Sequence, residues 1–200
     1  AHLPPAPRTG VIVDSDDPKW RSVLGAPVLD RDVFAIDVAT LKVRRDYRGV
    51  GTTLFAMDVD SQGRVFVAAT DARNRVRFEP KLRGHTVDNL VTRITPGAQT
   101  PVARFDLNPG VDYSKLPNDA ALASAIAQPT DLVVHGSRVY VAGYGSDRVG
   151  VLDTNGRVLA RIDIGVNLGK TTDPRKKRGP RGLAMHPRAQ YLYVLNRIHG

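Results

Sequence analysis

Short apolar runs separated by polar turns give the chain its most regular pattern, which lies between Gln128 and Gly165. Each run is rich in Val, Leu, Ile or Tyr and closes on Gly, Asn, Asp or Ser, which is typical of antiparallel hairpins. The pattern predicts four consecutive strands, over Asp131–Val134, Arg138–Ala142, Asp147–Asp153 and Arg157–Ile164. Four consecutive antiparallel strands form one blade of a β-propeller, so we expect copies of this unit elsewhere in the chain.

Both halves of the four-strand unit recur along the chain. The first two strands, here called the inner pair, are found at Leu54–Thr70, Thr130–Gly145 and Arg181–Arg197. The last two strands, the outer pair, are found at Asp32–Tyr47, Asn89–Leu107 and Asp147–Ile164. A β-sandwich also contains many short strands, but it does not repeat the same four-strand order. The repeats therefore favour a propeller.

We expect an all-β fold, a β-propeller of four-stranded antiparallel blades with about three blades' worth of strand and one short helix in a loop. Residues 1–31 are predicted to form an extended, Pro-rich lead-in, and residues 32–200 a partial propeller. The propeller part is divided into an outer half-blade (32–48), two blades (52–107 and 129–164) and an inner half-blade (180–198).

The two half-blades leave the predicted ring incomplete. Closed propellers have roughly 4–8 blades, and three blades close poorly. One interpretation is that these residues are a piece of a longer chain, which supplies the remaining blades. The other is that two copies share their half-blades in one six-bladed ring. In either case an open blade edge exposes unpaired backbone groups, so we expect the chain to need a partner there.

Two segments resemble a known repeat family. YVAGYGSDRVGVLD (Tyr140–Asp153) and GPRGLAMHPRAQYLYVLNR (Gly179–Arg197) are similar to the bacterial YVTN-type β-propeller repeats. The family pattern is a Pro-x-Gly-apolar-Ala strand, a His-Pro or Asp-Gly turn, Tyr-Val, and a later Val-x-Val-x-Asp strand. The resemblance extends from Val33 to Gly200, although Tyr-Val-Thr-Asn itself is replaced by Tyr140-Val141-Ala142-Gly143 and Tyr193-Val194-Leu195-Asn196.

The resemblance implies a bacterial protein of the periplasm or the extracellular space. Some long chains of this family couple such propellers to c-type haem domains of the peroxidase kind. It therefore implies a redox protein as partner and a c-type haem in sequence outside these residues. No cysteine is present, so we expect no cofactor within this stretch and, in particular, no thioether-attached haem, disulfide or thiolate metal site. The start at Ala1, followed by Pro-rich sequence, suits a processed mature terminus or the edge of a cut piece.

Three long insertions are predicted to lie on one face of the propeller. Asp71–Val87 lies between the second and third strands of a blade, whereas Asn108–Gln128 and Val166–Pro180 each join the last strand of one blade to the first strand of the next. In an up-and-down blade, connections of these two kinds emerge on the same face. Long loops in a compact domain are usually functional or disordered, and we expect this face to be the binding face. The first and third insertions are strongly basic, and the formal net charge of the chain is +9. The candidate binding residues are Arg73, Arg75, Arg77, Lys81, Arg83, Lys170, Arg175, Lys176, Lys177, Arg178 and Arg181.

We expect this basic face to bind an acidic protein. The alternative is a solvated loop whose charges only keep the protein soluble. Nucleic acid is disfavoured, because stacking on bases needs interleaved aromatic residues and Phe78 is the only one in the basic loops. The first insertion also carries His85, and the middle one carries a candidate rim contact over Gly110–Tyr113. A membrane helix is not expected, since no apolar run approaches ~20 residues.

The middle insertion predicts a short helix over Asn118–Ala127, capped by Asn118 or Asp119 and lying across the disc. The competing function is a propeller hydrolase or lyase with a metal ion in the central channel. The starts of the inner strands, where such a metal is held, are Thr53, Asp131 and Arg181. Asp131 is the only anion among them, and one carboxylate does not make a metal site. Asp131 is thus an isolated metal-ligand candidate, and we assign no catalytic residue.

Overall fold

The computed structural model describes residues 30–73, 85–165, 177–188 and 190–198, together with Pro18 and Leu82 as single positions. The elements of the described residues are β1 (Val33–Asp37), β2 (Lys42–Tyr47), β3 (Thr53–Val59), β4 (Val65–Ala72), β5 (Val87–Ile94), β6 (Val102–Asp106), α2 (Asp119–Ser124), β7 (Pro129–His135), β8 (Arg138–Gly143), β9 (Arg148–Asp153), β10 (Val158–Asp163), β11 (Pro180–Met185) and β12 (Leu192–Asn196). Nearly all of the predicted lead-in lies outside the described residues.

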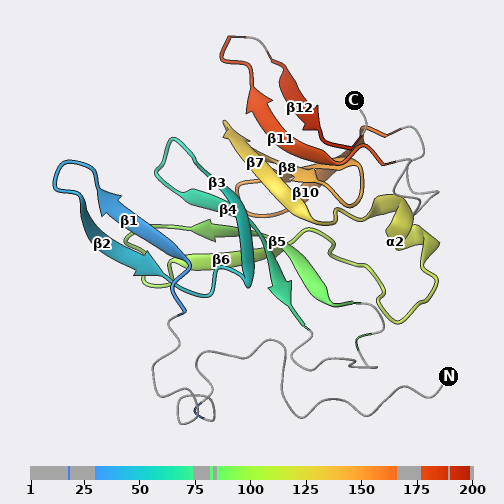
Figure 1. Cartoon of the computed structure of the whole chain (residues 1–200), viewed down its shortest axis with the longest axis horizontal. Coiled ribbons are helices and arrows are strands. Elements are labelled where there is room, and N and C mark those ends of the chain that lie inside the picture. Colours follow the sequence, from blue (N-terminus) through green and yellow to red (C-terminus); the bar gives the residue numbers. More distant parts are fainter. Residues whose placement is uncertain are drawn as a thin grey trace.

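The strands form two complete four-stranded sheets and two hairpins (Figure 1). The complete sheets are antiparallel meanders in chain order, β3-β4-β5-β6 and β7-β8-β9-β10, here called sheet B and sheet C. The hairpin β1-β2 precedes them, and the hairpin β11-β12 follows them. The predicted fold class, an all-β propeller of four-stranded antiparallel blades, is confirmed. No helix of the described residues is long and apolar enough to cross a membrane.

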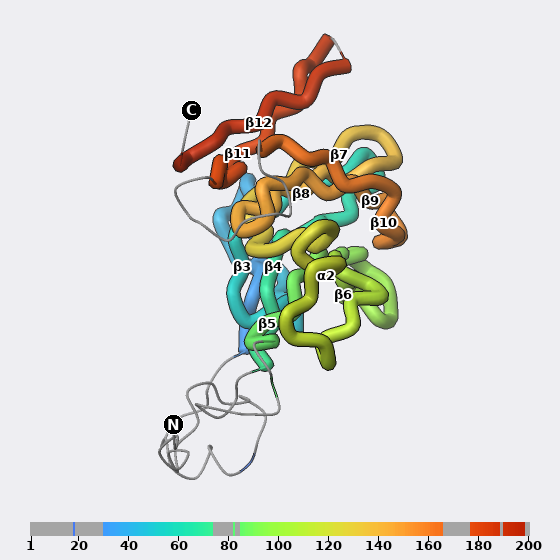
Figure 2. The backbone as a smooth tube through the Cα atoms, turned by 90° about the vertical axis from the view of Figure 1, so that its right-hand side faces the viewer, coloured from blue at the N-terminus to red at the C-terminus, as the bar shows by residue number. Residues whose placement is uncertain are grey.

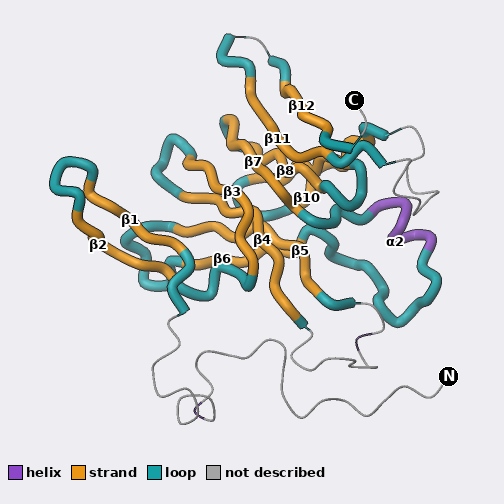
Figure 3. The backbone as a smooth tube through the Cα atoms, viewed as in Figure 1, coloured by secondary structure: helices purple, strands orange, loops and turns teal. Residues whose placement is uncertain are grey.

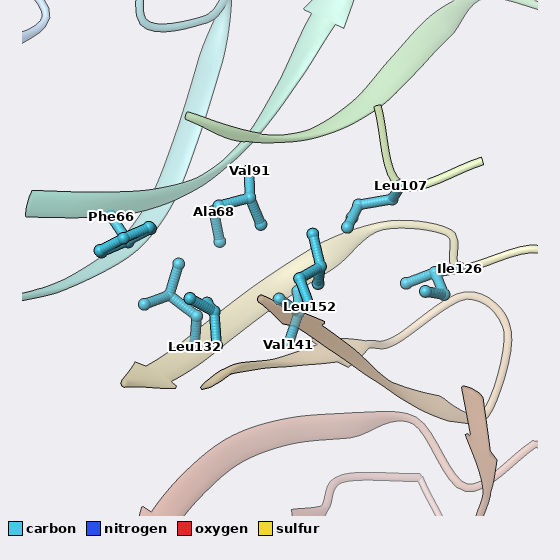
Figure 4. Packing of buried hydrophobic residues seen from close by; sticks show 9 residues of the cluster. Phe66, Ala68, Val91, Leu107, Ile126, Leu132, Val141 and Leu152 are labelled. Carbon is cyan, nitrogen blue, oxygen red and sulfur yellow. The ribbon is translucent and has the colours of Figure 1, made fainter. Parts of the chain in front are cut away.

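The larger hydrophobic core lies between sheets B and C. Phe66 and Ala68 of β4 face Leu132 of β7 and Leu152 of β9, and Ile126 packs in from the connection before β7 (Figure 4). Full burial of an aliphatic or aromatic side chain of this size stabilises a fold by about 1.5–3 kcal/mol. This junction between neighbouring blades is therefore the main source of stability among the described residues.

The second core lies on the opposite face of sheet B, where the β1-β2 hairpin packs. Tyr47 and Val50 meet Val67 and Ile94 there, and all four are buried. Strand β4 thus has neighbours on both of its faces, with Phe66 in one core and Val67 in the other. A strand buried on both faces must be apolar at consecutive positions, which explains the run Val65-Phe66-Val67-Ala68-Ala69.

Two tight turns repeat the sequence pattern Asp-x-x-Gly-Arg. In the β3–β4 turn, Asp60 Oδ1 accepts the backbone N–H groups of Gln62 and Arg64, each at 2.9 Å. In the β9–β10 turn, Asp153 Oδ1 accepts those of Asn155 and Arg157 at 2.9 and 3.0 Å. A carboxylate that accepts amides two and four residues further on fixes a hairpin turn locally, so the hairpins are encoded in short sequence.

Candidate functional site

The long connections lie at one end of the strands, which we call the loop-bearing face. They join β4 to β5, β6 to β7 and β10 to β11, and strand alternation in a meander puts all three at the same end. Figure 3 shows α2 at this end, while the tips of the β1-β2 and β11-β12 hairpins point the other way. Figure 2 looks onto the loop-bearing face and shows α2 in front of the two complete sheets.

A groove of about 290 Å³ is hollowed into the loop-bearing face, between the start of β5 and the β6–β7 connection. Val87, Val111, Leu116 and Ala121 contribute apolar surface to its lining. Lys115 also lines it, and its Nζ lies 3.7 Å from Asp112 Oδ2. We call it the α2 groove. An apolar depression of this kind suits an apolar group of a ligand.

One wall of the α2 groove is a stacked pair of rings from two different insertions. The ring centroids of His85 and Tyr113 are 3.5 Å apart, and the ring planes differ by 8°. His85 Nε2 lies 2.7 Å from Asp88 Oδ1, and Arg73 Nη1 lies 3.1 Å from Asp88 Oδ2. Burial raises the pKa of the Tyr113 hydroxyl, and the Asp106 and Asp88 carboxylates add to the rise. Tyr113 is therefore a neutral phenol that can donate a hydrogen bond at the wall of the groove.

Two buried polar side chains hold the α2 connection in place. Asn108 donates from Nδ2 to the Ile126 carbonyl (2.8 Å), and its Oδ1 accepts the Ile126 N–H (2.7 Å). Arg148 donates from Nη1 to the carbonyls of Leu122 and Ala125, and its Nε pairs with Asp163 Oδ1 at 2.6 Å. A cation that binds the last carbonyls of a helix satisfies groups that the helix itself leaves free.

The helix is shorter than the sequence predicts, and its position differs. It spans Asp119–Ser124 rather than Asn118–Ala127, with Asn118 as the N-cap whose Oδ1 accepts the Ala121 N–H at 3.0 Å. Ala125 has an extended backbone that ends the helix, which directs Ile126 into the core between the sheets. No residue of α2 is buried, so the expectation that the helix lies across the disc away from water is wrong.

The candidate basic residues divide into two sets. Arg73, Lys177, Arg178 and Arg181 are described; Arg75, Arg77, Lys81, Arg83, Lys170, Arg175 and Lys176 lie outside the described residues. Arg73 lies beside the α2 groove through its pair with Asp88, whereas the other three belong to the approach to β11 and to β11 itself. The backbone N–H groups of Arg178 and Gly179 both donate to Asp147 Oδ1 at 3.0 Å. The described basic residues therefore share the loop-bearing face but flank different blades.

Asp131, the isolated metal-ligand candidate, uses both carboxylate oxygens within the fold. Its Oδ1 accepts the N–H of Leu132 (2.9 Å), and its Oδ2 accepts the N–H of Leu183 in the neighbouring β11 (2.7 Å). Asp58 does the same from β3, binding the N–H of Val134 in β7 at 2.8 Å. These two carboxylates link the innermost strands of adjacent blades. Among the described residues, no group of three or more His, Cys, Asp or Glu side chains is arranged to hold a metal ion.

The sequence indicated His85 and Tyr113 separately but gave no sign that they meet. Asp88, which joins His85 to Arg73, was not singled out at all. Only one feature of the sequence could have indicated Asp88: it is an acidic residue in an otherwise basic region, two positions before the buried Leu90.

No protein-family model matches the chain, and no curated protein matches it. Among solved structures, hydrazine synthase from Kuenenia stuttgartiensis is similar with a TM-score of 0.53 and 18% identity, over 81% of this chain and 50% of that one. A catalytically inactive virginiamycin B lyase from Staphylococcus aureus with quinupristin gives 0.43 and 12%, over 74% of this chain and 36% of that one. The chain thus spans half or less of the length of the structures that it resembles. At these identities the likeness establishes the fold alone, which is a β-propeller.

Proposed function

We propose that this chain is a β-propeller binding module, exported to the periplasm or the exterior of a bacterial cell, whose loop-bearing face docks an acidic protein. The observation that carries the proposal is the convergence of the long basic connections and the α2 groove on one face. Charge steers a partner to a surface, while a desolvated apolar pocket supplies most of the affinity. The loop-bearing face offers both.

The chain's own structure prepares this face for binding. Asp147 fixes the backbone at Arg178, and the Arg178 carbonyl in turn accepts the Ile198 N–H at 2.9 Å. The His85–Tyr113 stack fixes the wall of the α2 groove. Groups held in place before binding lose less conformational entropy when the partner arrives, which raises affinity.

The resemblance to YVTN-type repeats supports a redox protein as the acidic partner, with a c-type haem carried outside these residues. The competing proposal, a hydrolase or lyase with a metal ion in the channel, has less support. The only anion at the predicted metal position is Asp131, whose two oxygens already accept backbone N–H groups. One carboxylate does not make a metal site.

The test compares two charge-reversal variants with the same loss of net charge. One carries Arg175→Glu, Lys176→Glu and Lys177→Glu in the sequence between β10 and β11. The control carries Arg45→Glu, Arg138→Glu and Arg188→Glu, three exposed positions elsewhere. The probe is fluorescently labelled poly-L-glutamate, titrated at several NaCl concentrations. We expect the first variant to bind about tenfold more weakly than the control at low salt, and the gap to close as salt rises. Equal weakening in both variants, or a gap that is independent of salt, contradicts the proposal.

A further inference from the structure

A second pocket lies where the outer strands of sheets B and C meet, and its lining shares no residue with that of the α2 groove. It measures about 520 Å³ and is bordered by β6 and β10, the edge strands of the two sheets. Phe105, Pro109 and Val158 contribute apolar surface to its lining, and Arg157 and Arg161 contribute positive charge. We call it the rim pocket. Both sheets that form it have all four strands, so it does not depend on a further blade.

Strand alternation decides which side chains of β6 face the rim pocket. Phe105 packs against the core between sheets B and C. Because successive side chains of a strand point to opposite faces, Arg104 and Asp106 point to the other face of sheet B. Arg104 pairs there with Asp71, and Asp106 Oδ1 accepts the Asn108 N–H at 2.8 Å. Strand β6 therefore presents an aromatic ring to the rim pocket, and its one carboxylate is directed elsewhere.

Arg161 brings a positive charge to the rim pocket that no carboxylate of the described residues balances. Its Nη2 donates to the Leu107 carbonyl at the end of β6, at 3.3 Å. Its neighbours on sheet C differ, because Arg148 pairs with Asp163 and Arg157 pairs with Asp153. A guanidinium held against the opposite sheet by one long bond keeps most of its N–H donors for another acceptor.

Arg93 adds a second unbalanced charge behind the aromatic ring. Its Nη1 donates to the Thr154 carbonyl (2.8 Å) and to Asn155 Oδ1 (3.1 Å), and its Cζ lies 5.4 Å from the centroid of the Phe105 ring. Its Nε is buried and has no hydrogen-bond partner among the described residues. Arginines that are withdrawn from water are normally paired with an anion, so this junction favours the entry of a negative charge.

We propose that the rim pocket binds an organic carboxylate that has an aromatic or aliphatic body. A guanidinium matches a carboxylate in geometry and can donate two parallel hydrogen bonds to it. Phe105, Pro109 and Val158 would cover the apolar body. One unpaired guanidinium in the lining balances a single negative charge, which favours a monocarboxylate over a phosphate dianion. The site requires neither the loop-bearing face nor an acidic protein.

NMR titration of the whole chain with sodium phenylacetate tests the proposal, with ionic strength held constant by NaCl. We expect saturable shifts at the Gly156 backbone and at the Arg161 side chain, which both line the rim pocket. Sodium acetate lacks the ring, and phenylacetamide lacks the charge. Each should bind at least about tenfold more weakly than phenylacetate, because each loses one of the two kinds of contact.

Three variants with the same loss of charge locate the site. Arg161→Gln should weaken phenylacetate binding at least about tenfold, because it removes the unbalanced guanidinium. Arg157→Gln should weaken it less, since Asp153 already compensates that charge. Arg138→Gln is the control and should leave the affinity unchanged, because Arg138 is exposed at the start of β8 and does not line the pocket. Backbone shifts outside β10 show whether each variant keeps its fold.

Four results overturn the proposal. They are shifts that do not saturate, equal binding of phenylacetate and phenylacetamide, equal weakening by Arg161→Gln and Arg138→Gln, and tighter binding of acetate or inorganic phosphate than of phenylacetate. The comparison of phenylacetate with phenylacetamide needs no variant, so it tests the role of charge even if Arg161→Gln alters β10. Failure here leaves the proposed function untouched, since its own test changes Arg175, Lys176 and Lys177.

Discussion

The junction between sheets B and C and the open side of the β1-β2 hairpin are built from the same repeat, yet they differ in packing. At the junction, Leu132 and Leu152 are buried against the neighbouring blade. At the open side, Ile36 and Met57 occupy matching repeat positions and are exposed. The difference shows that the repeat encodes the strand and its two apolar faces, whereas burial depends on whether the adjacent blade is present.

Hydrogen bonds between neighbouring blades are also found at the closed junctions. Asp58 of β3 binds the Val134 N–H across the junction to sheet C, and Asp131 binds the Leu183 N–H across the junction to β11. The opposite side of β3 has no such neighbouring strand among the described residues. Propeller stability is therefore expected to reside in closed junctions rather than in individual blades.

The largest expected effect comes from truncating the same repeat position at a closed and an open junction. Leu132→Ala removes a buried side chain from the core between sheets B and C, and should lower the free energy of unfolding by about 2–5 kcal/mol. Met57→Ala, its counterpart on the open side, should cost less than about 1 kcal/mol, because Met57 is exposed. Urea denaturation measures both. Similar costs for the two variants would contradict the division into closed and open junctions.

The elements and their order could be predicted from sequence because alternation and turn chemistry are local. Carboxylates such as Asp60 and Asp153 bind amides within four residues, so each turn is specified by its own short segment. The exposure of Tyr193 could not be predicted, because it matches the buried Phe66 in the repeat and differs only in its neighbour.

The candidate site could be predicted only in part, for a similar reason. The sequence located the long connections on one face and marked their charge. The contact between His85 and Tyr113 joins two insertions that are distant in the chain, and the loss of the last turn of the predicted helix depends on Ile126 entering a core formed by both sheets. Such contacts depend on the arrangement of the blades, which no short segment specifies.

A smaller effect is expected from alanine substitutions at two turn glycines, one that lies against a neighbouring side chain and one that faces open space. Both Gly156 and Gly136 have positive φ values, +87° and +58°, which cost a side chain about 1–2 kcal/mol. A Cβ at Gly156 would also overlap the Phe105 ring of the neighbouring sheet, whereas one at Gly136 meets nothing within 4 Å. We therefore expect Gly156→Ala to lower the unfolding free energy at least twice as much as Gly136→Ala. Equal costs by thermal denaturation would show that the Phe105 contact yields without strain.

The smallest effect is expected in the loss of stability at acid pH, at two aspartates in turns. Asp60 lies in the β3–β4 turn of sheet B, and Asp37 lies in the β1-β2 hairpin. Burial raises the pKa of Asp60, but hydrogen bonds from Arg64 and Gln62 outweigh it, so the pKa lies below its ordinary value of 3.8. The Thr40 backbone N–H and the Arg44 side chain lower the pKa of Asp37 as well. A carboxyl group with a depressed folded-state pKa stabilises the fold fully above its unfolded value, and this contribution is lost as pH falls through the lower folded value.

We expect Asp60→Asn to cost about 1 kcal/mol at neutral pH and to flatten the loss of stability below pH 3.8, since the Asp60–Arg64 ion pair is largely shielded from solvent. Asp37→Asn should change the acid profile less, and its effect should vanish in high salt, because the Asp37–Arg44 pair is open to solvent. Urea titrations between pH 2 and 7, about the range over which carboxyl groups titrate, give both profiles. If the two variants gave equal profiles at every salt concentration, the closed junction would have no electrostatic influence on the turn beside it.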